Sequence, residues 1–282
     1  MTPMEQARER VRAWKGGMLD LRNLGLTELP ELPTGLEILY CSKNRLSSLP
    51  DTLPAALICI RCDKNQLTTL PDTLPANLQW LYCSYNQLTR LHDTLPARLT
   101  ELYCYHNRLT RLPDTLPVCL TELSCWYNRL IRLPDSLPRC LRTLKCSDNR
   151  LSRLPDTLPE SLTELYCEYN QLLSLPDTLP VSLTMLDCTN NRLTMLPDTL
   201  PAGLTYLACG QNELTTLPDT LPTDLEELRC DYNNFPRREY EEPISVYVAR
   251  VNAIAEAASR ERIMQRCALA FEELAQKATL PV

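Results

Sequence analysis

The sequence offers one arrangement of side chains with the spacing for acid–base chemistry. Glu101 and Glu122 stand one period apart in a 21-residue repeat, and Glu164 follows two periods later. On neighbouring parallel strands two such carboxylates would lie about 5 Å apart, which is the spacing in retaining glycosidases. Catalysis would also need pocket walls that give the two groups different pKa values. An open strand surface predicts a solvated acidic face that attracts a basic partner instead.

Cysteine is the second residue type that could do chemistry. Ten of the fourteen cysteines recur at one position of the repeat, from Cys41 to Cys230. In-register side chains in such a column point the same way, so neighbouring cysteines are poorly placed for disulfides. The column also lacks the clustered spacing of a tetrahedral metal site. We therefore expect ten buried, reduced thiols that act as small apolar core residues in a reducing compartment.

The other cysteines and the histidines give no further catalytic pattern. Cys119 and Cys140 share a column in adjacent repeats and are the pair to test for oxidation, although free thiols are expected. Cys59 and Cys267 stand alone. His92 replaces a repeat proline, and His106 follows a strand. These residues form neither a triad nor a metal site, so the sequence predicts no enzyme, no cofactor and no metal.

Composition narrows the range of partners. The net charge is −6, from 29 basic and 35 acidic residues. This charge argues against nucleic acid, whose binding proteins need a basic stripe. No apolar run is long enough for a membrane span. The charged N-terminal segment has no apolar core of the kind found in secretory signals.

An asparagine repeats every 21 residues and defines the organisation of the chain. A fixed period of this length is typical of a solenoid. The repeat reads L-x-x-L-x-C-x-x-N-x-L-x-x-L-P-D-T-L-P-x-x, and its asparagine can bond to the backbone of its own turn and of the neighbouring turn. The ten asparagines are Asn44, Asn65, Asn86, Asn107, Asn128, Asn149, Asn170, Asn191, Asn212 and Asn233.

Three segments follow from this pattern. Residues 1–17 are expected to form a helical cap, with a helix at 2–15 that starts with a capping box of Thr2 and Glu5. Residues 18–235 are one degenerate and ten regular repeats, of which the first regular repeat begins at Leu36. Each repeat has a strand with one buried face and a Leu-Pro-Asp-Thr-Leu-Pro stretch. Two prolines make that stretch extended and polyproline-like, because they remove backbone donors.

The C-terminal segment, 236–282, is predicted to be helical. Ile244, Tyr247, Val248, Val251 and Ile254 form one apolar stripe, and Ile263, Cys267, Phe271 and Leu274 form another. The phase slips by one residue near Ser259, which predicts two helices. This segment either caps the last repeat or serves for docking and oligomerisation.

The repeat resembles the short bacterial-type leucine-rich repeat of type III secreted effectors of the IpaH/YopM type. The opening RAWKGGMLDLRNLGLTELPELPTGLEIL also looks like the entry to those arrays, and the resemblance covers about residues 10–235. It implies an α/β-type solenoid: a horseshoe with a parallel β-sheet on the concave face, a polyproline-like convex side and helical caps. The L-Y-C-x-x-N strand is also similar to repeats of large DNA viruses.

Ligase activity is not implied by this resemblance. Ligase members of the family carry a catalytic domain after the repeats, with a nucleophilic cysteine in a Cys-x-Asp motif. Cys267 is followed by Ala268 and Leu269, so the motif is missing there. Cys146-Ser147-Asp148 matches the letters, but Cys146 belongs to the core column.

The exposed strand positions vary while the core positions hardly change. Aromatic residues gather there in the third to fifth regular repeats, beside the two glutamates, and Tyr and Trp are the residues enriched at binding hot spots. Stacking that only stabilises the sheet is the alternative explanation. The predicted binding residues are Trp80, Tyr82, Glu101, Tyr103, Tyr105, Glu122 and Trp126.

Three functions are compatible with this sequence. The leading one is a non-catalytic module that binds a protein or peptide with a basic and hydrophobic surface, as an effector or scaffold. The second is a structural subunit of a larger assembly such as a viral particle, and the third is the repeat portion of a ligase-type effector without its catalytic domain. The expected location is the cytoplasm; host cytoplasm after non-classical delivery and a viral particle are the alternatives.

Overall fold

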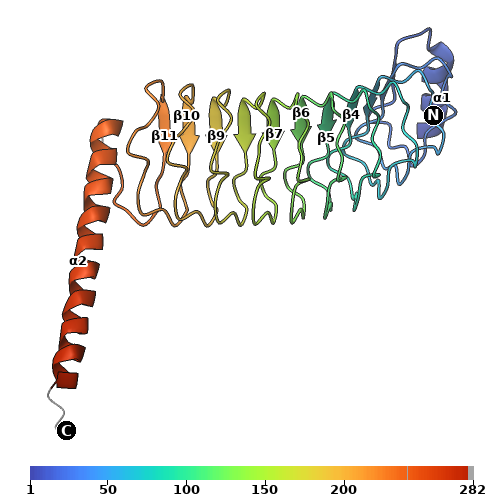
Figure 1. Cartoon of the computed structure of the whole chain (residues 1–282). Helices are drawn as coiled ribbons and strands as arrows, with labels where there is room; N and C mark the ends of the chain where they lie inside the picture. The colour runs from blue at the N-terminus through green and yellow to red at the C-terminus, as the bar shows by residue number, and fades with distance from the viewer. Residues whose placement is uncertain (240, 279–282) are drawn as a thin grey trace.

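The computed structural model describes residues 1–239 and 241–278, except for the side chains of residues 267, 268 and 270–278. Eleven short parallel strands form one sheet in the order of the sequence, with a helix at each end of the stack (Figure 1). The elements are α1 (Pro3–Ala13), β1 (Met18–Asp20), β2 (Ile38–Tyr40), β3 (Cys59–Arg61), β4 (Trp80–Tyr82), β5 (Glu101–Tyr103), β6 (Glu122–Ser124), β7 (Thr143–Lys145), β8 (Glu164–Tyr166), β9 (Met185–Asp187), β10 (Tyr206–Ala208), β11 (Glu227–Arg229) and α2 (Ile244–Ala278).

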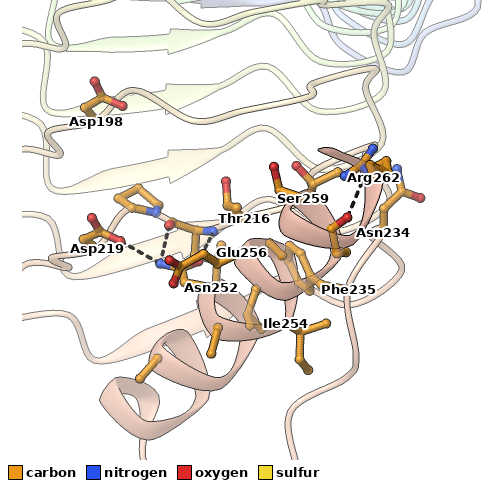
Figure 2. A pocket seen from close by; sticks show the side chains of 18 residues that line it. Asp198, Thr216, Asp219, Asn234, Phe235, Asn252, Ile254, Glu256, Ser259 and Arg262 are labelled. Atoms are coloured by element: carbon orange, nitrogen blue, oxygen red, sulfur yellow. Dashed lines mark hydrogen bonds between the residues drawn. The ribbon is translucent and has the colours of Figure 1, made fainter. Parts of the chain in front are cut away.

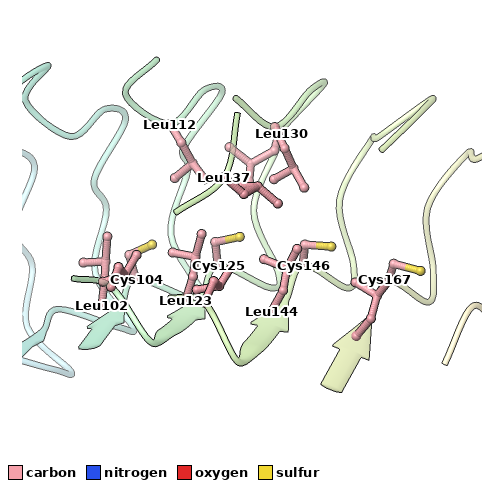
Figure 3. Packing of buried hydrophobic residues seen from close by; sticks show 14 of the residues in the cluster. Leu102, Cys104, Leu112, Leu123, Cys125, Leu130, Leu137, Leu144, Cys146 and Cys167 are labelled. Carbon is pink, nitrogen blue, oxygen red and sulfur yellow. The ribbon is translucent and has the colours of Figure 1, made fainter. Parts of the chain in front are cut away.

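Equivalent positions of successive repeats lie directly side by side. Leu81 of β4 pairs with Leu102 of β5, and Leu102 pairs with Leu123 of β6. Because the register advances by one whole repeat at each step, every core position forms a continuous column. Leucines and cysteines fill these columns, and Figure 3 shows them packed between the sheet and the returning convex segments. The predicted solenoid is confirmed.

The asparagines of the repeat, here called the asparagine ladder, tie each turn to the one before it. The side-chain Nδ2 of Asn128 donates to the carbonyl of Cys125 in its own repeat, at 3.0 Å, and to that of Cys104 in the preceding repeat, at 3.1 Å. Its Oδ1 accepts from the backbone N–H of Leu109 at 3.0 Å. The ladder therefore satisfies backbone groups that the short strands leave without a partner.

Loss of one ladder asparagine should be costly. We expect Asn128→Ala to lower the free energy of unfolding by about 1–3 kcal/mol, because the N–H of Leu109 loses its partner and the carbonyls of Cys104 and Cys125 each lose one of their two asparagine donors. Thermal unfolding followed by circular dichroism measures the change. Ile131→Ala in the same repeat is the control, because its side chain is 61% exposed and its loss should change little. Equal stability of parent and Asn128→Ala would show that this asparagine is not structural.

The ten cysteines of the repeat, here called the cysteine ladder, are buried and free. In Figure 3 the sulfur atoms of Cys104, Cys125, Cys146 and Cys167 all point the same way along the stack. The thiols of Cys146 and Cys167 donate to backbone carbonyls of the next repeat, at 3.4 and 3.3 Å, and are not paired with another sulfur. Burial raises the pKa of Cys125 to about 12, which keeps the thiol protonated at neutral pH. The expectation of unreactive core thiols agrees with this arrangement.

Thiol reactivity should separate two classes of cysteine. Cys119 and Cys140 are exposed, whereas the other eleven described cysteines, including Cys59, are buried. We expect a chromogenic thiol reagent to react rapidly with Cys119 and Cys140 in the native protein and with all fourteen after unfolding. A Cys119→Ser/Cys140→Ser variant should lose this fast phase, and Cys267→Ser accounts for the residue whose side chain is not described. Ten or more fast thiols without denaturant would contradict the buried ladder.

Helix α1 begins with the predicted capping box. The Thr2 hydroxyl accepts from the N–H of Glu5 at 3.2 Å, and the Glu5 carboxylate accepts from the N–H of Thr2 at 2.7 Å. Ala7 is buried, and Val11 and Trp14 pack against the core. The helix ends at Ala13, two residues before the predicted limit.

The prediction of two C-terminal helices was wrong. Helix α2 is a single helix from Ile244 to Ala278, and Figure 1 shows that most of it extends beyond the stack. Tyr247, Val248 and Val251 are buried against the last repeats, whereas Ile263 and Met264 are 58% and 70% exposed. The phase slip near Ser259 therefore marks the place where the helix leaves the repeats, not a break in the helix.

The second apolar stripe and the membrane-spanning potential of the helices can be assessed only over the described residues. The second predicted stripe is described only in part, because the side chains of Cys267, Phe271 and Leu274 lie outside the described residues. Neither helix contains, over its described length, an apolar stretch that could cross a membrane.

Candidate binding surface

Three neighbouring strands carry most of the predicted binding residues. Register pairs Trp80 of β4 with Glu101 of β5, and Glu101 with Glu122 of β6. Tyr82 lies beside Tyr103 in the same way. In each strand the middle leucine is buried and these flanking residues are partly exposed, because successive side chains of a strand point to opposite faces. The pleat thus places all five on the outer face of the sheet.

Tyr82 and Tyr103 form a stacked pair on this face. Their ring centroids are 4.8 Å apart with an interplanar angle of 24°. The Tyr82 hydroxyl donates to Oε2 of Glu101 at 2.6 Å, and the guanidinium of Arg61 lies 4.3 Å from the centre of the Tyr82 ring. Burial and the Glu101 carboxylate raise the pKa of Tyr82, so it remains a neutral hydrogen-bond donor. These contacts hold the ring in one orientation before any ligand arrives.

The two glutamates already have partners within the protein. Glu101 accepts the Tyr82 hydrogen bond, and a carboxylate oxygen of Glu122 lies 4.0 Å from Nζ of Lys145. Burial and the neighbouring Glu122 raise the pKa of Tyr103. The surface is therefore less acidic in effect than the sequence suggested, and its carboxylates serve partly to orient aromatic rings.

Tyr105 and Trp126 form a second stack just after the strands end. Their centroids are 4.6 Å apart and their rings are nearly parallel, at 10°. His106 meets Trp126 edge to face at 4.5 Å and stacks between Tyr85, at 4.3 Å, and Tyr127, at 4.0 Å. Burial lowers the pKa of His106, while Asp148 opposes this shift. Six of the seven predicted residues are therefore the four rings of these two stacks and the two glutamates beside the tyrosine pair, Glu101 and Glu122.

Trp80 is the exception among the predicted residues. It lies in register between Cys59 and Glu101, and it stacks on none of the aromatic rings that the structure describes. Its side chain is partly exposed.

The turn that carries Tyr85, His106 and Tyr127 has an unusual backbone. These residues have φ angles of 53°, 50° and 54°, in the left-handed region that favours glycine or asparagine. The equivalent residue of every repeat has the same conformation, from Asn23 to Tyr232. The sequence did not indicate this left-handed conformation, because lysine, tyrosine and histidine occupy most of these positions.

The sequence predicts three exposed strand columns, which begin at Ile38, Tyr40 and Ser42, and it overestimates how much of them is exposed. The small side chains in these columns are buried, because the large aromatic and charged side chains of adjacent repeats cover them. The buried members are Ser42, Cys59, Ser84, Ser124, Ser147 and Ala208. Exposure is therefore concentrated on the large residues of the columns.

A second hollow on the same face was missed by the sequence reasoning. It encloses about 330 Å³ and is lined by Glu168, Asp187, Tyr206, Asp231 and Gly210, among others. Burial raises the pKa of Glu168. A Cβ on Gly210 would lie 2.9 Å from the carbonyl oxygen of Asp231, so only glycine fits there. The signal that could have found this hollow is the pair of small residues, Ala208 and Gly210, in columns that elsewhere carry larger side chains.

The junction of α2 with the last repeats contains a larger groove. The groove has a volume of about 1200 Å³. Figure 2 shows the side chains that line it, which include Phe235, Ile254 and Asp219. Asn252 fastens the helix to this loop, with Nδ2 donating to the Leu217 carbonyl at 3.0 Å and to Asp219 at 2.9 Å. The groove is therefore explained as the line of contact between α2 and the last repeats, and it need not be a binding site.

The described side chains that could bind a metal ion are not clustered. No group of three or more His, Cys, Asp or Glu residues among them is arranged to hold an ion.

Comparison with solved structures agrees with this architecture. YopM from Yersinia enterocolitica superposes with a TM-score of 0.66 and 36% sequence identity over 78% of this chain. The functional domain of InlJ from Listeria monocytogenes, which is described as including a cysteine ladder, superposes with a TM-score of 0.67 and 33% identity over 74% of this chain. The fold is the leucine-rich-repeat solenoid.

The leucine-rich-repeat domain of APL1B is a third similar structure, with a TM-score of 0.60 and 26% identity over 77% of this chain. The chain spans about half the length of the first two structures, 51% of YopM and 47% of the InlJ chain. No protein-family model matches this leucine-rich-repeat sequence, and none of the curated proteins compared with it matches.

Proposed function

We propose that this protein is a non-catalytic module that binds a protein or peptide on the outer face of strands β4–β6. Leucine-rich-repeat proteins generally act through such surfaces, because a solenoid exposes an extended sheet face. The binding residues of the proposal are Trp80, Tyr82, Glu101, Tyr103, Tyr105, Glu122 and Trp126.

The observation that carries this proposal is the preorganised pair Tyr82–Tyr103. The stack at 4.8 Å and the 2.6 Å bond to Glu101 fix both rings at the surface while leaving them partly exposed. Fixed aromatic rings lose little conformational entropy on binding, which favours their use as anchors. A core that only needed filling would not require hydroxyl partners on the solvent side.

The partner should present an apolar residue next to a lysine or arginine. The apolar residue would lie on the stacked tyrosines, and the cation would approach Glu101 and Glu122 or the faces of the rings. Because Lys145 now pairs with Glu122, a cation of the partner has to compete with it. We therefore expect the apolar contact to supply most of the affinity and the charges to supply selectivity.

A second candidate function rests on the free part of α2. Ile263 and Met264 are exposed on a helix that extends away from the repeats, as a subunit of a larger assembly would use. Oligomerisation through these helices is part of that alternative. A size measurement in solution separates the two, because a monodisperse monomer favours the module and a defined oligomer favours the assembly.

The cellular setting of the proposal follows from the cysteine ladder. Buried free thiols in every regular repeat suit a reducing compartment such as cytoplasm. The likeness to YopM supports the idea of an effector acting in host cytoplasm, and the scaffold role belongs to the same proposal.

Capture from a candidate host lysate tests the function directly. The parent protein and a Tyr103→Ala/Trp126→Ala variant are compared as bait, with Tyr232→Ala as the control, since Tyr232 is an exposed ridge aromatic far from the proposed surface. A protein retained by the parent and the control but lost by the double variant supports the proposal. Retention by all three baits would place the binding elsewhere on the solenoid.

A further inference from the structure

Three consecutive repeats carry an arginine immediately after the ladder asparagine. These residues, Arg108, Arg129 and Arg150, are here called the arginine ladder, and all three are exposed. Their backbone N–H groups bond to the carbonyls of Leu88, Leu109 and Leu130 of the preceding repeats, at 2.8 Å in each case. These bonds hold the three in register. Neighbouring members are therefore about 4.8 Å apart along the stack at their backbones.

The positive charges of this ladder are not balanced by the protein itself. Over the part of the chain that the structure describes, none of the three side chains has an ion pair or a side-chain hydrogen bond. Three like charges in one column repel each other, weakly here because all three side chains are exposed to solvent, and the column leaves three positive charges free for an anion.

A neighbouring arginine column shows the opposite behaviour. Three arginines stand three residues further along the same repeats, and each reaches an aspartate of the preceding repeat. The pairs are Arg111 with Asp93 at 3.2 Å, Arg132 with Asp114 at 2.9 Å and Arg153 with Asp135 at 3.9 Å. The same repeats thus contain one neutralised and one unneutralised arginine column.

The arginine ladder borders a hollow with aromatic walls. The hollow has a volume of about 410 Å³, and its lining includes Arg108, Arg129 and the stacked rings of Tyr85, His106 and Tyr127. Guanidinium groups bind carboxylates through paired hydrogen bonds, and the ring edges offer apolar contact. The hollow lies on the ridge beside the strand face and does not include the residues of the proposed function.

We propose that the arginine ladder and this hollow form a second interaction surface, which binds an acidic peptide segment rich in Asp or Glu. The net charge of −6 favours a short acidic segment over a long nucleic acid, because the rest of the protein repels an extended polyanion. The carboxylates would pair with Arg108, Arg129 and Arg150, and an apolar side chain of the peptide would lie against Tyr127. This surface is formed by other residues than the binding face on β4–β6, and the two meet where His106 packs on Trp126.

A labelled deca-glutamate peptide is the probe for this surface. We expect the parent protein to bind it at low salt and Arg108→Ala/Arg129→Ala/Arg150→Ala to bind it at least about tenfold more weakly, the loss expected for three exposed ion pairs. Arg111→Ala/Arg132→Ala/Arg153→Ala is the matched control, because it removes the same charge from the neutralised column. Circular dichroism confirms that both variants fold.

Each result decides the proposal. Loss of binding in the first variant only, with a single-stranded decathymidylate bound more weakly than the peptide, supports it. Equal losses in both variants would show a general charge effect and overturn it, and so would unchanged binding in the first variant. Tighter binding of the oligonucleotide through the same arginines would replace the acidic peptide with a nucleic acid.

Discussion

Replacing Tyr247 with alanine is expected to destabilise the protein by about 3–5 kcal/mol, as for other large aromatic side chains removed from a core. The Tyr247 side chain is 0% exposed and packs edge to face with Phe235 at 6.3 Å. Its hydroxyl donates to the carbonyl of Pro236 at 3.0 Å and lies 3.5 Å from the Sγ of Cys230. The substitution would leave a cavity over the last repeat and two polar groups without a partner.

Urea unfolding followed by circular dichroism measures this change. Ile263→Ala is the control, because Ile263 lies on the same helix but is exposed beyond the repeats, and its loss should change stability by less than about 0.5 kcal/mol. A Tyr247→Ala protein as stable as the parent would mean that α2 does not protect the end of the solenoid.

Deleting residues 240–282 tests the same role on a larger scale. The deletion uncovers Leu228 and Cys230, which close the core at its C-terminal end, and removes the Asn252 bonds to the loop at Leu217. An uncovered terminal repeat exposes apolar core, so we expect aggregation. Light scattering of the purified variant checks this outcome. A soluble and equally stable deletion variant would favour a docking role for the whole helix.

Tyr103→Ala and Trp126→Ala should each weaken partner binding by about 2 kcal/mol or more, if the surface on β4–β6 binds as proposed. Tyr103 is one half of the stack with Tyr82, and Trp126 is one half of the stack with Tyr105. Truncation removes the contact area of one ring and also frees the ring that it holds in place. Neither change should unfold the protein, because both side chains project from the face opposite the buried leucines.

Isothermal titration or surface-based kinetics with the captured partner measures these effects. Tyr232→Ala, at the far end of the ridge, should leave the affinity unchanged. Added salt should slow association more than it speeds dissociation, since Glu101 and Glu122 would act mainly in the encounter. If both substitutions leave the affinity of a confirmed partner unchanged, the proposed surface is wrong and the free part of α2 becomes the next candidate.

The sequence by itself determined the solenoid, its register and most of its core. The ladder from Asn44 to Asn233 predicted both hydrogen-bond directions, to its own turn and to the neighbouring one, and Asn128 makes both. The sequence also predicted the capping box of Thr2 and Glu5, and the structure has both of its hydrogen bonds. These features are local or repeat with the period of the chain, so each repeat specifies its contacts with the next.

Only the tertiary structure decided how the surface side chains meet. The stacking of Tyr82 on Tyr103, the bond to Glu101 and the pairing of Glu122 with Lys145 depend on rotamers chosen among neighbours from three repeats. Periodicity shows which column a residue occupies but not how its side chain is directed. The burial of Ser84 and Ser124 under larger neighbours was missed for the same reason.

The course of α2 was also decided in three dimensions. A phase slip at Ser259 can mean a break in a helix or a change in what the helix touches, and the sequence pattern is the same in both cases. The last repeat contacts only the first turns of α2, through residues such as Tyr247 and Val251, so the later stripe need not keep the same phase. The sequence periodicity does not encode how far the contact between α2 and the last repeat extends. Only the structure could therefore distinguish a break in the helix from the end of this contact.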